Sequence, residues 1–235
     1  MAISTRKKIL IIERDKSVRG KLNKRLTQLG YILCFATTGK AALSVFKNEQ
    51  PHLVIVDLIL YHLDGYEVCR RIRKNSTVPI ILLSSIKKIT NRVLGLELGA
   101  DDYLTKPFSG KELEIKISSI LRRTLKTESF EDKLPVRIKD LTFSKINKEV
   151  FRDGKKVNLT SMELSLLELL IENAGVTLSR TSILNNVWGY KPERTIDTRL
   201  VDLYIFRLRS KLKLNGQYPD YISTVRGIGY VFQKK

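Results

Sequence analysis

The chain has 235 residues, 43% of them hydrophobic and 29% charged, which allows one large or two small folded domains and argues against bulk disorder. Its apolar runs are all too short for a membrane span, and its formal net charge of +19 at pH 7 favours a polyanionic partner such as nucleic acid. Residues 1–124 hold 23 basic and 11 acidic side chains, against 20 and 13 in the remainder, so charge alone does not locate a binding surface.

The basic start of the chain is followed by a short apolar run at 9–12. This run is too short for a secretory signal and predicts a buried strand of a soluble, intracellular protein. The two cysteines, Cys34 and Cys69, share no metal-ligand spacing, and the chain has only two histidines, His52 and His62. We therefore expect neither a disulfide nor a zinc site.

Apolar runs and helical spacings alternate through the first half of the chain. Strands are predicted at 8–12, 31–36, 53–56, 79–83 and 103–105. Helices are predicted at 17–29, 41–46, 66–73, 88–98 and 111–123. This alternation predicts an α/β fold with a doubly wound, five-stranded parallel sheet.

In such a sheet the chemistry lies beyond the carboxyl ends of the strands. The side chains at four of these ends are Glu13, Asp57, Ser84 and Lys106. Asp57 can act as a nucleophile and accept a phosphoryl group, while Lys106 and a metal ion can neutralise the added charge. Each residue alone is typical of a cap or a loop, but the four together predict a site of phosphoryl transfer.

Three runs around this site carry a family resemblance. They are LVIVD at 53–57, LDGY at 63–66 and GLELGADDYLTKPF at 95–108. On these runs, residues 7–123 resemble a bacterial-type receiver domain, which has a flavodoxin-like fold.

The resemblance implies a role for each residue of the predicted site. Asp57 would be phosphorylated by a partner sensor histidine kinase, with Lys106 as its ion-pair lysine. Ser84 would be the switch hydroxyl and Tyr103 the aromatic switch, and Pro107 would follow a cis peptide bond.

Receiver domains usually hold Mg²⁺ with two adjacent carboxylates after the first strand. Here the resemblance implies Glu13, Asp57 and the backbone carbonyl of Ile59 as ligands, but the second carboxylate position holds Arg14. Arginine has no acceptor atom and stays charged, so it cannot bind the metal. Asp15 lies one residue further along and is expected to cap the next helix.

Arg14 leaves two hypotheses open. It can pair with Asp57, compete with Mg²⁺ and weaken phosphorylation, or it can turn to solvent and leave Glu13 and Asp57 to bind the ion. Tyr61 stands where the family usually has a proline, which is expected to loosen the loop after Asp57.

The last part of the predicted receiver carries charges of both signs. In the subfamily that this chain resembles, such residues form salt bridges across a symmetric dimer. The expected dimer surface consists of Arg92, Glu97, Asp101, Asp102, Glu112, Lys116 and Arg123. The alternative is an ordinary solvated helix surface, where such pairs contribute little.

Residues 124–135 are polar, have no sustained period and end in proline, which predicts a linker. Short strands are then predicted at 136–138, 141–144, 149–152 and 156–159, with a tight turn at Asp153-Gly154. Thr160 and Glu163 form the pattern of a capping box that opens a helix. Two more helices are predicted at 179–187 and 195–212, and a closing hairpin from strands at 221–225 and 230–232.

Three helices and a glycine-tipped hairpin resemble a winged helix-turn-helix domain, an α+β fold, over residues 136–234. The residues that carry this likeness are Thr160, Trp188-Gly189, Arg207-Leu208-Arg209 and TVRGIGY at 224–230. The whole chain therefore resembles the two-component response regulators of the winged-helix, OmpR/PhoB-type subfamily, and among these the regulators of cyanobacteria and algal plastids.

The third helix of this domain has an apolar stripe that is expected to pack inward, formed by Val201, Ile205, Leu208 and Leu212. Its other faces can enter the major groove of DNA. Arg207 is expected to contact a base, Phe206 to touch a thymine methyl or to pack, and Arg226 of the wing to enter the minor groove. The expected phosphate contacts are Arg199, Tyr204, Arg209 and Lys211.

The sequence thus predicts a DNA-binding transcription regulator, and no enzyme, that phosphorylation of Asp57 controls. The alternative is a DNA-binding regulator whose receiver dimerises with little or no dependence on phosphorylation, because Arg14 replaces a metal-binding carboxylate. A phosphatase with an aspartate nucleophile would need a carboxylate where the chain has Ile59. The expected partners are double-stranded DNA, a sensor histidine kinase, RNA polymerase and a second copy of the chain, in the cytoplasm or, for an organelle-encoded protein, the plastid stroma, without membrane association.

Overall fold

The computed structural model describes residues 6–61, 63–86, 94–123, 135–189, 198–213 and 221–233. The chain divides into two compact units, residues 1–121 and 122–235, and each has its own sheets and core. The predicted linker lies outside the described residues except for Pro135. No helix of the described residues is long and apolar enough to cross a membrane.

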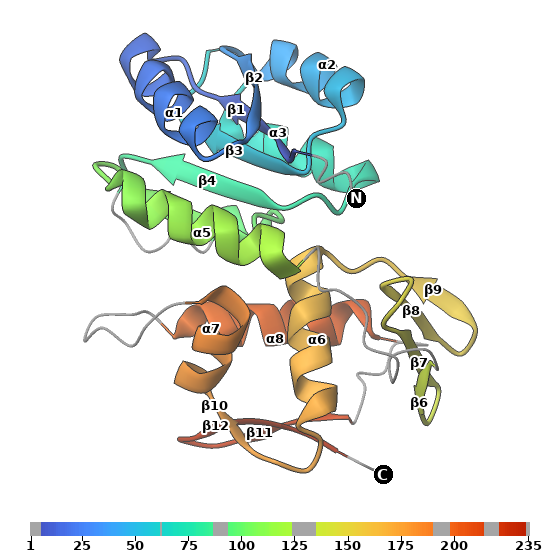
Figure 1. Ribbon diagram of the computed structural model, residues 1–235. Coiled ribbons are helices and arrows are strands. Elements are labelled where there is room, and N and C mark those ends of the chain that lie inside the picture. The colour runs from blue at the N-terminus through green and yellow to red at the C-terminus, as the bar shows by residue number, and fades with distance from the viewer. Residues whose placement is uncertain are drawn as a thin grey trace, which may run out of the picture. The chain divides into compact units, whose positions relative to one another are not determined.

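The first unit is built on a five-stranded parallel sheet with the order β2-β1-β3-β4-β5 (Figure 1). The strands are β1 (Lys8–Ile12), β2 (Ile32–Ala36), β3 (Leu53–Asp57), β4 (Ile80–Ser84) and β5 (Asp102–Thr105). All residues of β3 and β4 are buried, as expected of strands that are covered on both faces. The order changes direction between β1 and β3, which confirms the predicted doubly wound sheet.

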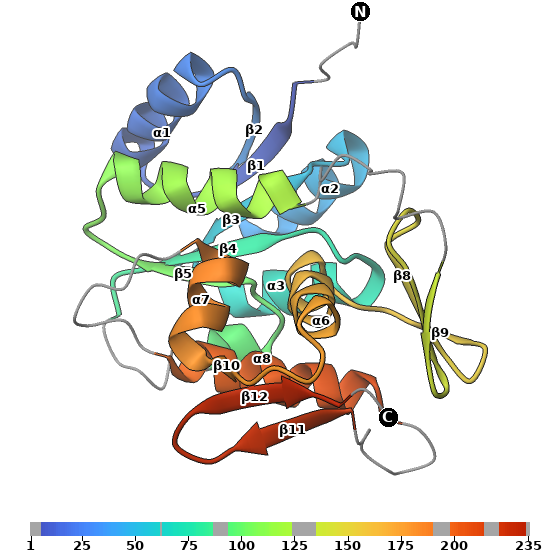
Figure 2. The same cartoon turned by 60° about the horizontal axis from the view of Figure 1, so that its bottom comes forward.

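Helices cover both faces of this sheet. They are α1 (Lys16–Gln28), α2 (Gly39–Glu49), α3 (Gly65–Asn75) and α5 (Gly110–Arg123). An ion pair between Arg25 and Glu114 joins α1 to α5 on one face, and α2 contacts α3 on the other (Figure 2). Of the helix predicted at 88–98, the described residues show a helical turn at 94–97, and residues 87–93 lie outside the description.

The start of α1 shows what Asp15 does. Its carboxylate accepts hydrogen bonds from the backbone N–H groups of Ser17 at 2.7 Å and Val18 at 3.2 Å. These are two of the N–H groups that a helix leaves without an internal partner. The predicted cap is confirmed, and the carboxylate of Asp15 is used at the helix end and not at the phosphoryl-transfer site.

The second unit begins with an antiparallel four-stranded sheet in the order β6-β7-β8-β9. Its strands are β6 (Val136–Ile138), β7 (Leu141–Ser144), β8 (Glu149–Arg152) and β9 (Lys155–Val157). Asp153 and Gly154 join the last two strands with φ values of 48° and 71°. Positive φ at both positions is the geometry of the tight hairpin that this dipeptide predicts.

Three helices follow: α6 (Ser161–Glu172), α7 (Arg180–Trp188) and α8 (Arg199–Lys211). The capping box of Thr160 and Glu163 is present at the start of α6. Trp188 is buried, and so is the predicted apolar stripe of α8. The part of the third predicted helix before residue 198 lies outside the described residues.

The closing hairpin consists of β11 (Ile222–Val225) and β12 (Gly229–Phe232), which pair antiparallel as predicted. A two-residue strand, β10 (Leu178–Ser179), adds to β12 and was not expected from the sequence. A Cβ atom on Gly229 would lie 2.0 Å from the carbonyl oxygen of Leu178. Gly229 therefore allows the close approach of β10, in addition to forming the hairpin.

Candidate functional site

The phosphoryl-transfer site predicted in the first unit forms around one ammonium group. The Nζ atom of Lys106 lies 2.5 Å from Glu13 Oε2 and 2.7 Å from Asp57 Oδ2. Glu13 is fully buried and Asp57 is 5% exposed. The three side chains come from the ends of β1, β3 and β5, so the parallel sheet alone brings them to one edge.

Burial and charge act in opposite directions on these groups. Desolvation raises the pKa of Glu13, with a contribution from the neighbouring Asp57 charge, and the bond from Lys106 offsets this only in part. Burial lowers the pKa of Lys106, but its ion pairs with Asp57 and Glu13 outweigh that and leave the pKa above its ordinary value. The ammonium therefore stays charged between two carboxylates.

The two predicted switch residues are both hydrogen-bonded to the main chain of Ile86. Ser84 Oγ accepts a hydrogen bond from the Ile86 backbone N–H at 2.9 Å. The hydroxyl of Tyr103 donates to the Ile86 carbonyl oxygen at 2.8 Å, and Tyr103 is only 4% exposed. A movement of Ser84 is thus coupled to the hydrogen bond of Tyr103 through one residue, a connection that the sequence does not reveal.

The backbone around Asp57 is held closely. Gly65, the first residue of α3, packs against the main chain of Asp57, and a Cβ atom there would lie 2.4 Å from the Asp57 carbonyl oxygen. The peptide bond between Lys106 and Pro107 is cis, as predicted. Gly65 belongs to the LDGY run, but the spacing of that run gives no sign that the residue positions the acceptor.

The oxygen atoms that could hold Mg²⁺ are fewer than in a site with three carboxylates. Glu13 and Asp57 are adjacent, and the Ile59 backbone N–H donates to Asp57 Oδ1 at 3.1 Å, which keeps that loop against the acceptor. Among the described residues no group of three or more acidic, histidine or cysteine side chains could hold a metal. Two carboxylates still fit Mg²⁺, because this ion commonly binds through one or two and keeps several waters.

Arg14 does not form an ion pair with Asp57 in the described structure. It is exposed, and its guanidinium carbon lies 5.2 Å from the centre of the Tyr61 ring, a cation–π distance. This is the second of the two orientations considered for Arg14, in which the guanidinium leaves the carboxylates. Tyr61 also forms a parallel bridge with Thr38. This bridge holds the loop at the position where the family usually has a proline.

The expected DNA contacts of the second unit fall into two groups. Arg199, Phe206 and Arg226 are exposed, with Phe206 at 58%. The prediction for Tyr204 is wrong: it is fully buried, and its ring meets Trp188 edge-on with 4.9 Å between centroids. A residue of the core cannot contact phosphate, and the spacing missed it because Tyr204 flanks the apolar stripe of α8.

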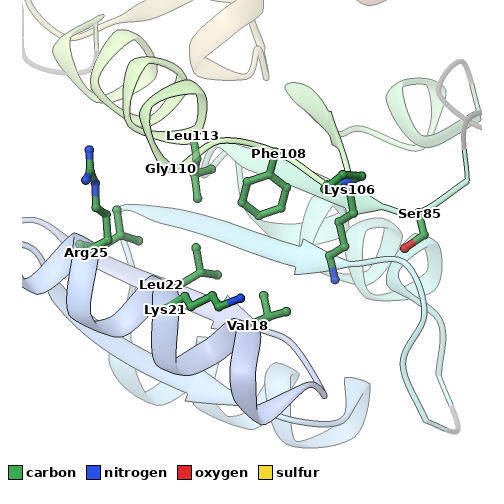
Figure 3. Close-up of a pocket in the computed structure, with 11 residues that line it drawn as sticks. Val18, Lys21, Leu22, Arg25, Ser85, Lys106, Phe108, Gly110 and Leu113 are labelled. Atoms are coloured by element: carbon green, nitrogen blue, oxygen red, sulfur yellow. The ribbon is translucent and has the colours of Figure 1, made fainter.

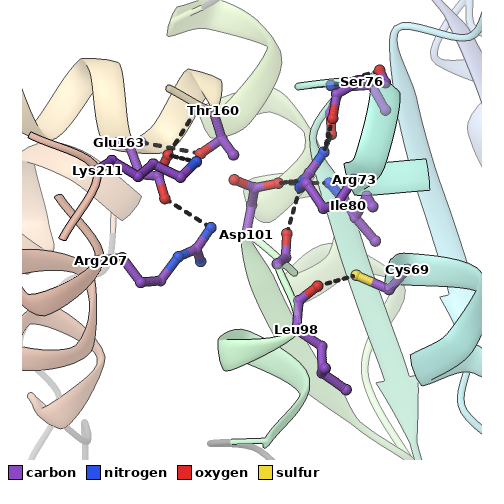
Figure 4. A network of polar contacts seen from close by, with 12 residues as sticks. Cys69, Arg73, Ser76, Ile80, Leu98, Asp101, Thr160, Glu163, Arg207 and Lys211 are labelled. Carbon is purple, nitrogen blue, oxygen red and sulfur yellow. Dashed lines mark hydrogen bonds and ion pairs between the residues drawn. The ribbon is translucent and has the colours of Figure 1, made fainter. Parts of the chain in front are cut away.

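Arg207, which is predicted to read a base, is bound to a protein carboxylate in this structure. The Nη2 atom of Arg207 lies 2.9 Å from Glu163 Oε1, and the side chain is only 11% exposed (Figure 4). Lys211 Nζ lies 2.6 Å from the other carboxylate oxygen of Glu163. Arg209 donates to the carbonyl oxygen of Ile222 at 2.7 Å and to Thr224 Oγ1 at 3.0 Å. These cations of α8 bind protein groups in this structure.

Glu163 is the functional residue that sequence reasoning underestimated. It appeared only as the second member of a capping box, and its carboxylate indeed accepts from the Thr160 N–H at 2.8 Å. The side chain is also fully buried and binds two cations of α8. It therefore fixes α8, the helix expected to read DNA, against α6.

Three residues of the expected dimer surface have partners inside their own domain. Asp101 is fully buried, forms an ion pair with Arg73 and accepts the Ile80 N–H at 2.9 Å (Figure 4). Asp102 and Lys116 are both buried and pair at 3.0 Å. Buried charges need such partners, and these contacts form within a single copy of the chain.

Two of the remaining residues of that set, Glu97 and Glu112, are exposed. Arg92 and the side chain of Arg123 lie outside the described residues.

Comparison with known proteins gives the same two-part division. Residues 9–118 match the family described as response regulator receiver domain, and residues 154–232 match the family described as transcriptional regulatory protein, C terminal. Probable transcriptional regulators ycf27 from Porphyridium aerugineum and Cyanophora paradoxa are 50% and 49% identical, over 97% of this chain and 97% of theirs. The response regulator MprA of Mycobacterium bovis is 37% identical over 97% of each chain.

Solved structures agree. The response regulator DrrB of Thermotoga maritima, described as an OmpR/PhoB homologue, is 32% identical and matches with a TM-score of 0.52, over 97% of this chain and all of that one. A mutant of the protein RitR matches with a TM-score of 0.75 and 28% identity over the same shares.

The buried Glu163 gives a prediction on pH. Burial alone would raise its pKa, but Arg207 and Lys211 outweigh burial and hold the pKa below its ordinary value. Stability from this carboxylate is thus complete above the pKa of an unfolded glutamate, about 4.3, and is lost as the pH falls towards the lower folded value. We expect Glu163→Gln to lower the free energy of unfolding at pH 7 by roughly 3 kcal/mol and to show a weaker loss in acid than the wild type.

Urea unfolding followed by the fluorescence of Trp188, the one tryptophan of the chain, measures the stability of the second unit. Glu168→Gln, on the same helix, serves as the matched control, because Glu168 is not among the partners of the two cations. An identical pH dependence in Glu163→Gln and the wild type would contradict the prediction.

Proposed function

The chain belongs to the DNA-binding response regulators of the OmpR/PhoB type, and on that basis we propose that phosphorylation of Asp57 controls its activity as a transcription regulator. The observation that carries the proposal is the Lys106 ammonium, which contacts both Asp57 and Glu13 at the carboxyl edge of the sheet. A buried carboxylate beside a fixed cation is prepared to accept a phosphoryl group.

The proposed donor is a phosphohistidine of a partner sensor kinase. An Asp57 oxygen attacks phosphorus, an oxygen–phosphorus bond forms, and the phosphorus–nitrogen bond to the imidazole breaks. Lys106 is already within hydrogen-bond distance of Asp57, so it neutralises charge on the acyl phosphate without a large movement. The Ile59 N–H holds the other oxygen of Asp57 and so orients the carboxylate for attack.

We propose that Glu13, Asp57 and the carbonyl of Ile59 hold Mg²⁺ when it is bound. The ion would supply further charge neutralisation for the transferred group. Its affinity is expected to be reduced, because Arg14 offers no oxygen atom and adds a positive charge near the site.

The signal then passes through Ile86, two residues after the end of β4. A phosphoryl oxygen on Asp57 would accept a hydrogen bond from the Ser84 hydroxyl, and a turn of the side chain towards it would break the bond that Oγ now accepts from the Ile86 N–H. Because Tyr103 donates to the carbonyl of Ile86, a shift of Ser84 would change the environment of Tyr103 and of the adjoining surface.

We propose that this surface, formed by the last receiver strand and its helices, pairs with a second copy of the chain. This surface exposes charged and apolar side chains together: Glu97 and Glu112 are exposed, and Leu94 and Ile115 are 43% and 45% exposed. Exposed apolar residues next to charges are typical of interfaces. A dimer would place two DNA-binding units on one DNA site.

For DNA contact we propose the exposed members of the predicted set, Arg199, Phe206 and Arg226. Phosphate oxygens could also attract Lys211, which is 34% exposed and bound to Glu163. Arg209 holds the main chain of β11 and so positions the wing. RNA polymerase is the further partner that such a regulator implies, and the cytoplasm or plastid stroma the location.

A second candidate function rests on Arg14. With one metal-binding carboxylate replaced, the receiver could dimerise and the chain could bind DNA without phosphorylation. The ion pairs of Lys106 support the first candidate, because the second makes no use of an acceptor carboxylate held beside a cation.

Replacing Arg14 tests the phosphorylation site. Arg14→Asp restores a second carboxylate, so we expect about tenfold faster phosphorylation by acetyl phosphate at limiting Mg²⁺. Asp57→Ala should not be modified at all. Intact mass measurement of the added phosphoryl group, taken over time at several Mg²⁺ concentrations, gives the rates.

Lys16→Asp is the control for charge alone. Lys16 is exposed, lies two residues after Arg14, and its replacement by aspartate changes the net charge by the same amount. Complete conversion of the wild type at the Mg²⁺ concentrations that Arg14→Asp needs would show that the site is not weakened.

A gel shift separates the two candidate functions. The DNA fragment is one recovered by sequencing the DNA that the protein binds. We expect acetyl phosphate to tighten wild-type binding by about tenfold, a common size for coupling between two sites, and to leave Asp57→Ala unchanged. Equal affinities of both proteins, with and without acetyl phosphate, would favour the constitutive alternative.

The wing gives a prediction on salt dependence. Arg226→Ala removes one exposed cation at the hairpin tip, so we expect weaker DNA binding and a salt slope (log affinity against log salt) smaller by about one. Fluorescence anisotropy at several salt concentrations measures both quantities. Lys155→Ala, an exposed lysine of β9, is the control; if both variants lose the same affinity, Arg226 has no specific role.

A further inference from the structure

A cavity of about 580 Å³ lies between α1 and α5 in the first unit (Figure 3). Its volume is within the range of small-molecule sites, about 300–1,000 Å³. The walls are largely apolar: Val18 and Leu22 come from α1, Leu113 from α5, and Phe108 from the segment between β5 and α5. An apolar space of this size is poorly suited to water, because water needs polar partners.

The polar groups that line the cavity are mostly cations. Lys21 and Arg25 come from α1, and Lys106 reaches the cavity from the acceptor site. Arg25 is paired with Glu114, and the Lys106 ammonium is paired with Asp57 and Glu13. Lys21 is exposed, and among the described residues no carboxylate lies within ion-pair distance of it.

We propose that this cavity binds an amphipathic monoanion, with an aliphatic chain or ring against the apolar walls and a carboxylate or sulfonate group on Lys21. Charge complementarity selects this occupant. An anion gains the attraction of the Lys21 ammonium, which a neutral apolar molecule does not, and a cation would be repelled by three basic side chains of the lining. The helix α1 adds to this, because it contains five basic and no acidic residues.

The site extends beyond the proposed function, since it requires neither phosphorylation nor DNA. It nevertheless adjoins the acceptor. The side chain of Lys106 lines the cavity, and its Nζ atom binds Asp57. A ligand in this place therefore adjoins the residue that neutralises the acceptor.

The test uses isothermal titration calorimetry of the full chain with decanoate, below its micelle-forming concentration, and with decanol as the uncharged probe of equal chain length. We expect decanoate to bind with one site per chain and at least about tenfold more tightly than decanol, a difference of about 1.4 kcal/mol. Lys21→Glu should weaken decanoate binding by about tenfold or more, because it places a like charge at the carboxylate.

Lys24→Glu is the matched control. Lys24 is an exposed lysine of the same helix that does not line the cavity, so its reversal should change decanoate affinity by no more than about twofold. A second variant, Val18→Trp, fills the cavity and should abolish decanoate binding, while Val18→Ala should retain it. Far-ultraviolet circular dichroism checks that each variant is folded. If Val18→Trp is unfolded, the comparison of Lys21→Glu with Lys24→Glu alone tests the proposal.

Three results would overturn the proposal. Equal affinities for decanoate and decanol, or equal losses in Lys21→Glu and Lys24→Glu, would remove the role of Lys21. If decanoate does not bind up to its solubility limit, the cavity is no site for an amphipathic anion. An apolar side chain of a protein partner would then be the occupant to test. None of these measurements involves phosphorylation. A negative result for decanoate would therefore leave the proposed control through Asp57 unaffected, and the reverse also holds.

Discussion

The charged site of the first unit depends on one ammonium group, that of Lys106. It lies between two carboxylates that the fold removes from water. Glu13 and Asp57 follow buried strands, so their positions are set by main-chain pairing before any charge is considered. Two buried negative charges at close distance would repel each other and be poorly solvated. Lys106 relieves both problems and leaves the three groups with one net negative charge. The site is thus held together while retaining an affinity for one more cation, which is the charge state that the proposed phosphoryl acceptor requires.

The second unit uses the opposite arrangement. Glu163 is one buried carboxylate that binds two cations of α8, so these three groups carry one net positive charge. The excess positive charge lies on the helix that faces DNA in this family, where phosphate is the natural additional partner. Lys211 is the more exposed of the two cations and Arg207 the more buried. Arg207 therefore maintains the packing of α8 on α6, while Lys211 could exchange between protein and phosphate.

The sequence predicted those features that follow from backbone geometry. Continuous apolar runs located the strands, and because parallel strands end at one edge, the meeting of Asp57 and Lys106 could be inferred without coordinates. The ion-pair partners of individual side chains could not be inferred in this way. Asp101 and Asp102 were assigned to a dimer surface, but they bind Arg73 and Lys116 of their own domain, and those contacts depend on how α3 and α5 pack. Helical spacing likewise placed Tyr204 with the exposed residues, because a tyrosine at the margin of an apolar stripe can face either way.

Arg14 illustrates how charge balance differs from direct contact. It is turned towards Tyr61 and forms no ion pair with Asp57 in the described structure, so it does not occupy the position of a metal ion. Arg14 instead changes the net charge of the group formed by Glu13, Asp57, Lys106 and the side chain at position 14. A carboxylate in its place would give the site two net negative charges and a strong demand for a divalent cation, whereas Glu13, Asp57 and Lys106 alone carry one. An exposed guanidinium nearby reduces even this, although solvent screens it. Under the proposed mechanism, the unphosphorylated site would therefore depend less on Mg²⁺, and the metal would bring a smaller advantage to phosphoryl transfer.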